Sequence, residues 1–141
     1  GHATACAAAV AVQKFLRADG FLENVEVKGK LLASTLKDRF EKHPHVGDIR
    51  GRGMLMTLEL VQDRETKAPF PAERGLSPQI YREALSRGLI THALGGTVDG
   101  LNGDHIVVCP PLIAGKKDLE TIVGLLGESV DASLLGLAVD R

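Results

Sequence analysis

Alternating apolar residues near the middle of the chain restrict its fold more than any other feature of the sequence. Met54, Met56, Leu58 and Leu60 occupy every second position. Successive side chains of a β-strand point to opposite faces, so this spacing places all four on one face. That face has to be buried. We expect the stretch 46–61 to form two strands, or one bent strand, of a sheet with one covered side.

Two glycines interrupt this stretch on either side of an arginine. Gly51, Arg52 and Gly53 predict a tight bend between strands, because glycine tolerates the backbone conformations that such a bend needs. A second interpretation is an anion-binding turn, since backbone amides beside a guanidinium suit carboxylates and phosphates. We favour the bend and keep Arg52 as a candidate for the wall of a binding pocket.

Helical patterns cover most of the remaining chain. Alanine, the best helix former, dominates residues 3–18, and polar positions there are few, so we expect a helix that is packed on most sides. An amphipathic helix is expected over residues 21–42, because apolar residues recur there at steps of three and four. A last apolar stripe predicts a helix over residues 119–130, with a frayed chain beyond Ala132.

A further helix is expected over residues 77–87. Ser77 is predicted to cap its free amides and Pro78 to occupy its first position, where the missing N–H costs nothing. Gly88 is expected to end it in the left-handed conformation. The polar residues 62–76 before it contain two prolines and are expected to form a surface loop.

The next segment contains two short strand candidates, residues 89–94 and 105–109. Between them lies the glycine-rich stretch 95–104 (GGTVDGLNGD), which has no apolar periodicity and is expected to be a mobile loop. Short strands therefore alternate with helices, without a dinucleotide-binding fingerprint. This predicts an α/β (α+β) fold, with a small, mainly antiparallel sheet covered by helices on one face.

Charge and composition exclude several classes of protein. The 17 basic and 18 acidic residues are scattered along the chain and give a net charge of -1, so we expect no nucleic-acid partner. The apolar stretch 3–12 is too short for a membrane span and lacks the flanks of a signal peptide, so we expect neither membrane insertion nor secretion. Cys6 and Cys109 are far apart, which indicates reduced thiols of a cytoplasmic protein. Cys109 is expected to be buried and inert.

Motif chemistry alone assigns no activity to this sequence. It contains no recognisable catalytic triad and no phosphate-binding loop, and His43 and His45 lack a third metal ligand nearby. His92, His105, Asp99 and Asp104 lie on or beside the glycine-rich loop. Such groups either meet a ligand or satisfy the amides of turns, and both interpretations remain open.

Three stretches, taken in order, carry a resemblance to a known family. They are GHATACAAAVAV, then VGDIRGRGMLMTLELV, and then HIVVCPPLI followed by an amphipathic helix. With the gaps between them, they resemble the C-terminal part of class III (ornithine/omega type) aminotransferases, which depend on pyridoxal phosphate. The resemblance covers nearly the whole chain.

The resemblance implies a fold-type I homodimer in which a large N-terminal domain binds pyridoxal phosphate and a small C-terminal domain closes over the substrates, an amino donor and a 2-oxo acid. Pyridoxal phosphate chemistry needs a lysine amine that holds the cofactor and a carboxylate that keeps its ring protonated. In this family both precede the part that this chain resembles. We therefore expect a fragment with no catalytic, cofactor-binding or metal-binding residue of its own, inactive in isolation.

One position departs from the ornithine-type members of the family. Those members carry an arginine three residues before the first proline of the PP pair, where it binds the substrate carboxylate. Here that residue is Val107. The resemblance thus implies a carboxylate clamp elsewhere or a different class of substrate. The substrate-pocket candidates are Arg52, Thr97, Asp99 and His105, the last three because they flank the loop expected to face the cleft.

The expected organisation has three parts. Residues 1–18 form an interdomain helix leading from the missing large domain, residues 19–135 form the small domain, and residues 136–141 form a tail. The alternative is a stand-alone α/β interaction or ligand-binding module that shares this fold. The absence of an initiator methionine favours the fragment, and the coding sequence upstream of Gly1 would distinguish the two.

Overall fold

The computed structural model of the chain describes residues 1–139 and, over 136–139, the backbone alone. In chain order the elements are α1 (Ala3–Leu16), α2 (Phe21–Phe40), β1 (Val46–Arg52), β2 (Leu55–Leu60), the short 3-10 helix η1 (Ala72–Arg74), α3 (Leu76–Ser86), β3 (His92–Gly95), β4 (Asp104–Val108) and α4 (Lys116–Val139).

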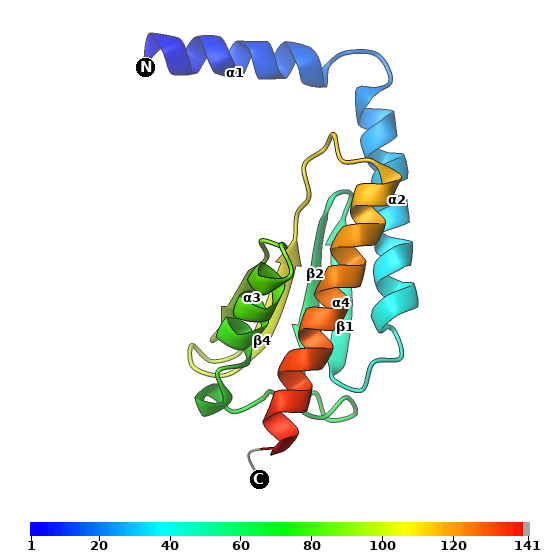
Figure 1. Cartoon of the computed structure of the whole chain (residues 1–141). Coiled ribbons are helices and arrows are strands. Elements are labelled where there is room, and N and C mark those ends of the chain that lie inside the picture. Colours follow the sequence, from blue (N-terminus) through cyan, green and yellow to red (C-terminus); the bar gives the residue numbers. More distant parts are fainter. Residues whose placement is uncertain (140–141) are drawn as a thin grey trace.

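The four strands form one sheet in the order β1-β2-β4-β3, and every neighbouring pair is antiparallel. Helices α2, α3 and α4 cover one face of this sheet (Figure 1). The predicted α+β architecture, with an antiparallel sheet covered on one face, is therefore confirmed.

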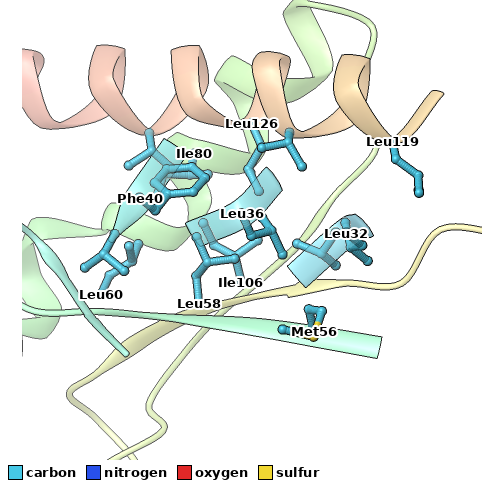
Figure 2. Close-up of a cluster of buried hydrophobic side chains, with 14 of the residues drawn as sticks. Leu32, Leu36, Phe40, Met56, Leu58, Leu60, Ile80, Ile106, Leu119 and Leu126 are labelled. Atoms are coloured by element: carbon cyan, nitrogen blue, oxygen red, sulfur yellow. The ribbon is translucent and has the colours of Figure 1, made fainter. Parts of the chain in front are cut away.

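The core lies between the sheet and the three helices. Met56, Leu58 and Leu60 point from β2 toward the helices, where they meet Leu32 and Leu36 of α2 (Figure 2). Each of these side chains is at most 4% exposed, which confirms the buried face predicted from the alternation. Burial of such side chains is the main stabilising contribution to a domain of this size.

The predicted bend joins β1 to β2 and is confirmed. Gly51 and Gly53 have φ angles of 147° and 59°, which L-residues with side chains rarely adopt. Helix α2 crosses close above this bend: a Cβ added at Gly29 would lie 2.5 Å from the Cα of Gly53. The absence of a side chain at Gly29 thus allows the helix and the hairpin to touch, whereas at Gly53 glycine is needed for its positive φ.

Helix α3 begins differently from the prediction. Its N-cap is Gly75, in the left-handed conformation and without a side-chain hydrogen bond, whereas Ser77 lies inside the first turn. Ser77 is buried and its hydroxyl donates a hydrogen bond to Asp104, which is remote in the sequence. The prediction of a Ser77 cap is wrong because a local pattern does not reveal a remote acceptor. Gly88 does end the helix with a positive φ, as predicted.

Helix α1 extends away from the other elements (Figure 1). None of its 14 residues is buried, so the expectation that it packs on most sides is wrong for the chain described here. The ring centroids of Phe15 and Phe21 lie 4.9 Å apart, at the junction with α2.

At the other end of the chain, α4 is helical up to Val139, beyond the point at Ala132 where we expected fraying. The division into residues 1–18, 19–135 and 136–141 stays a prediction, and residues 140–141 lie outside the described part.

Candidate functional site

The sheet face opposite the helices carries several polar side chains. The strand register aligns two outward rows across the four strands. One row consists of Arg50, Thr57, Val107 and His92, and the other of Asp48, Glu59, His105 and Leu94. All eight are exposed or half-buried. We call these eight residues the helix-free face.

An ion-pair network lies at the β1 side of the helix-free face. One guanidinium nitrogen of Arg50 donates to Asp48 at 2.8 Å and to Glu59 at 2.6 Å. These two hydrogen bonds raise the pKa of Arg50. The Arg50 charge is therefore compensated within the network, and it is a poor ligand for an incoming carboxylate unless the network opens.

His105 stands at the centre of the helix-free face, between Glu59 and Leu94 in the register. Burial lowers the pKa of His105 below its usual 6.5, and the Arg50 guanidinium lowers it further. The imidazole is therefore neutral at pH 7, with one nitrogen that donates and one that accepts a hydrogen bond. It can orient a polar ligand and does not attract an anion.

A cavity of about 390 Å³ opens beside the β3 edge of the helix-free face. Its lining includes Val107, His92, Cys109 and Ile122, and it contains no Asp, Glu, Lys or Arg. The Cys109 thiol is exposed, which corrects the expectation of a buried residue: it follows the last residue of β4 and lies outside the sheet. This cavity suits an apolar or uncharged group.

The glycine-rich loop folds into a compact turn. The Asp99 carboxylate accepts hydrogen bonds from the backbone N–H groups of Leu101 and Asn102 at 2.9 and 2.7 Å, and from the Asn102 side chain. These bonds, chiefly those from Asn102, lower the pKa of Asp99 to about 2. Asn102 in turn accepts a bond from the amide of Ala72. Of the two interpretations of Asp99, the hydrogen bonds favour the one in which it satisfies turn amides.

The structure separates the predicted pocket residues. Arg52 pairs with Leu55 at the β1–β2 turn, whereas Thr97 and Asp99 belong to the loop that precedes Asp104, at the opposite end of the sheet. The antiparallel order causes this separation, because β4 begins beside the last residue of β2. His105 lies next to the loop end, on the helix-free face.

Arg52 has different neighbours. It lines a cleft of about 600 Å³ between the β1–β2 turn and α2, together with Glu26 and Lys30. The cleft contains both signs of charge and gives Arg52 no specific anion pocket.

Sequence reasoning missed Glu59 and Thr57 as members of the helix-free face. Their only signal is that they alternate with buried leucines and methionines on β2. Alternation identifies an outward residue but does not identify the residues beside it on the next strand, since these depend on the register.

Comparisons with known proteins agree with this fold. The family model "Aminotransferase class-III" matches residues 1–130. An aminotransferase of Gibberella zeae is 40% identical over 135 residues, which cover 95% of this chain and 26% of that protein. The adenosylmethionine-8-amino-7-oxononanoate aminotransferase of Nitratidesulfovibrio vulgaris is 38% identical over 123 residues, which cover 87% of this chain and 21% of that protein.

Solved structures give the same result. A Bacillus anthracis aminotransferase matches with a TM-score of 0.80 and 31% identity, over 91% of this chain and 28% of that one. The chain therefore spans about a quarter of the length of the relatives it matches.

Proposed function

This chain belongs to the class-III aminotransferase family, and we propose that it forms the small domain of a pyridoxal-phosphate-dependent transaminase. The complete protein would move an amino group between an amine or amino acid and a 2-oxo acid, in a ping-pong cycle. The alternative, a stand-alone binding module, is not favoured, because the matched relatives are aminotransferases.

The lysines of this chain do not fit the cofactor. Pyridoxal phosphate has to be held by a lysine amine that is desolvated and free to react. Of the eight lysines, only Lys28 is half-buried, and its amine donates to the carbonyl oxygen of Leu112 at 3.1 Å. The other seven are exposed. We therefore propose that the cofactor's site lies in a part of the protein outside this chain.

We propose that the helix-free face forms a wall of the substrate pocket. The observation that carries this proposal is the position of Val107 in the outward row, beside Thr57 and His92. The family resemblance assigns a substrate-contacting arginine of ornithine-type members to this position. His105 and Thr57 would offer hydrogen bonds to a ligand there, while Thr97, Asp99 and Arg52 would act from the two ends of the sheet.

The chemistry of this wall supports a substrate group without a carboxylate. Arg50 is the one arginine of the helix-free face, and Asp48 and Glu59 already compensate its charge. The lining of the cavity next to Val107 contains no Asp, Glu, Lys or Arg. A carboxylate placed there would lose its hydration without gaining a cationic partner, which is unfavourable.

The surroundings of the domain are proposed from the same family. Helix α1 exposes Val10, Val12 and Phe15 to at least 54%, so we propose that it docks on the large domain of the complete protein. Within residues 1–139 no helix is long and apolar enough to cross a membrane. We further propose a homodimer, as the resemblance implies, and a location in the cytoplasm, as the widely separated Cys6 and Cys109 indicate.

The complete protein, supplied with pyridoxal phosphate, tests this function. With pyruvate as acceptor, amines and amino acids are offered one by one, and alanine formation is measured. Turnover with at least one donor is the expected result. If no donor of either class is converted while the protein binds small molecules without turnover, the binding-module alternative replaces the enzyme.

A further inference from the structure

The turn between α2 and β1 contains a histidine that the proposed function does not use. The His43 side chain is only 11% exposed. Its ring lies 6.1 Å from the ring of Phe40 and 6.1 Å from that of His45, and the His45 ring lies 5.3 Å from that of Phe70. The imidazole thus sits at the edge of the core, at the end of the sheet away from the β1–β2 turn.

Both ring nitrogens of His43 have partners. Nδ1 is 3.2 Å from the backbone nitrogen of His45, and Nε2 is 3.2 Å from a carboxylate oxygen of Asp131 on α4. A backbone N–H can only donate, so Nδ1 must be unprotonated to accept this bond. Nε2 then carries the hydrogen and donates a hydrogen bond to Asp131. The geometry therefore selects the neutral imidazole with its hydrogen on Nε2.

The charges around His43 do not favour a second proton. The other carboxylate oxygen of Asp131 accepts a hydrogen bond from Arg39 on α2, so the Asp131 charge is shared between two partners. Burial lowers the pKa of His43; Asp131 opposes this effect, while His45 and Arg39 reinforce it. These groups come from α2, from the turn and from α4.

His45 connects this site to the sheet. Its ring Nδ1 lies 3.2 Å from the carbonyl oxygen of Val61, and its own carbonyl accepts a bond from the Val61 amide at 3.0 Å. Val61 directly follows the last residue of β2. The amide that donates to His43 therefore belongs to His45, which is itself hydrogen-bonded to Val61 at the end of the β1–β2 hairpin.

We propose that the neutral His43 side chain acts as an acid-sensitive latch. By accepting the hydrogen bond from the His45 amide, it holds the α2–β1 turn in the conformation described above, the closed turn. In the open turn this hydrogen bond is broken. Protonation at Nδ1 of His43 removes the acceptor, so that two donors, this N–H and the backbone N–H of His45, face each other. The His45 amide then has to move away, and its pairing with Val61 loosens. This site lies at the end of the sheet that also carries the glycine-rich loop. The proposal does not depend on the proposed transaminase function.

The direction of the pH effect follows from linkage. Well above the usual histidine pKa of 6.5, the closed and open turns are both neutral and the closed turn is favoured. As the pH falls below 6.5, the open turn binds a proton that the closed turn resists. The opening equilibrium then rises by up to about tenfold per pH unit, until the pKa of the closed state is reached.

NMR on the 141-residue chain tests the latch directly. Imidazole nitrogen spectra are expected to show His43 as the neutral Nε2–H form near pH 7, with its titration midpoint below 6.5. Hydrogen exchange at the His45 amide, corrected for its intrinsic pH dependence, is expected to lose protection as the pH falls from about 7 to about 5. A hydrogen on Nδ1 at neutral pH, or unchanged His45 protection across the titration, overturns the proposal.

A matched pair of variants assigns the effect to His43. In His43→Asn, the side-chain oxygen can accept the amide two residues on without titrating, so the pH dependence of His45 protection should disappear. The same substitution at the exposed His2 should leave that dependence as in the unmodified chain. If His43→Asn keeps the full dependence, another group drives the opening and the latch is refuted. If this variant does not fold, the measurements on the unmodified chain still decide.

Discussion

The carboxylate of Asp104, at the start of β4, accepts hydrogen bonds from both the backbone N–H and the hydroxyl of Ser77, in the first turn of α3. Asp104 is 7% exposed and Ser77 is 2% exposed, so both groups are shielded from water. The helix's own N-cap, Gly75, has no side chain to perform this role. A residue of the sheet therefore caps a helix, and the same contact fastens the end of the glycine-rich loop.

Removing this remote cap should destabilise the chain. Asp104→Ala leaves two buried donors without an acceptor, and it removes a negative charge from a helix N-terminus. The free energy of unfolding should fall by about 1–3 kcal/mol in urea titrations. Asp38→Ala, at an exposed position of α2, is the control and should change stability by less than about 0.5 kcal/mol. Equal effects of the two substitutions would contradict the capping role.

Two glycine-to-alanine substitutions in helices should have opposite effects. At Gly29 the new Cβ would lie 2.5 Å from the backbone of Gly53, so the helix or the hairpin has to shift. We expect a loss of about 1–3 kcal/mol, as for other overpacked sites. At Gly124 of α4 a new Cβ meets nothing within 4 Å, and the gain in helix propensity should stabilise the chain by up to about 1 kcal/mol. Thermal unfolding of both variants compares them, and a stabilising Gly29→Ala would refute the close approach.

Asp99 should titrate at about pH 2, because the amides of its own turn favour the charged carboxylate. The folded-state pKa is depressed, so the stabilisation of the loop is present above the usual 3.8 and is lost as the pH falls toward 2. Carboxyl NMR titration measures this value. Hydrogen exchange at Leu101 and Asn102 should accelerate in Asp99→Ala. Unchanged exchange in that variant would mean that other contacts order the loop.

Asp99 and Thr97 also test the proposed role of the loop in substrate binding. In the complete enzyme, Asp99→Ala and Thr97→Ala should alter kcat/KM for at least one amino donor if the loop faces the cleft. Unchanged values for every donor would remove the loop from the site.

Val107→Arg should shift the substrate preference of the complete enzyme toward donors with a carboxylate. The new guanidinium would stand in an outward row beside Thr57 and His92, where a bidentate ion pair is feasible. We expect kcat/KM for such donors to rise about tenfold relative to donors without one. Val27→Arg, at a position that is 65% exposed on α2, is the matched control and should leave the ratio unchanged. The same shift in both variants would indicate a general effect of charge.

The 141-residue chain alone should not form a specific covalent adduct with pyridoxal phosphate. Its seven exposed lysines should react without preference for any one of them, because none is desolvated in a pocket that would hold the cofactor. Borohydride reduction followed by mass spectrometry checks this. One dominant modified lysine at low cofactor concentration would show that the chain carries a cofactor site after all.

Local sequence patterns were sufficient to predict most of the helices and strands. The alternation around Leu58 predicted a strand with one buried face, and the three- and four-residue spacing around Leu36 predicted an amphipathic helix, because each pattern reflects the geometry of its own segment. Gly88 was recognised as a helix end for the same reason. Expectations failed where a residue's environment comes from a distant segment, as for the burial of α1, the exposure of Cys109 and the cap of α3.

The sequence by itself therefore determined the elements, the covered face of the sheet and the resemblance to class III aminotransferases. Only the tertiary structure decided which side chains meet. It placed Arg52 and Asp99 at opposite ends of the sheet, and it aligned Arg50 with Thr57 and Val107 in one row. The physical reason is that periodicity depends on bonds within a segment, whereas neighbours across a sheet depend on strand order and register, which arise only when the core closes.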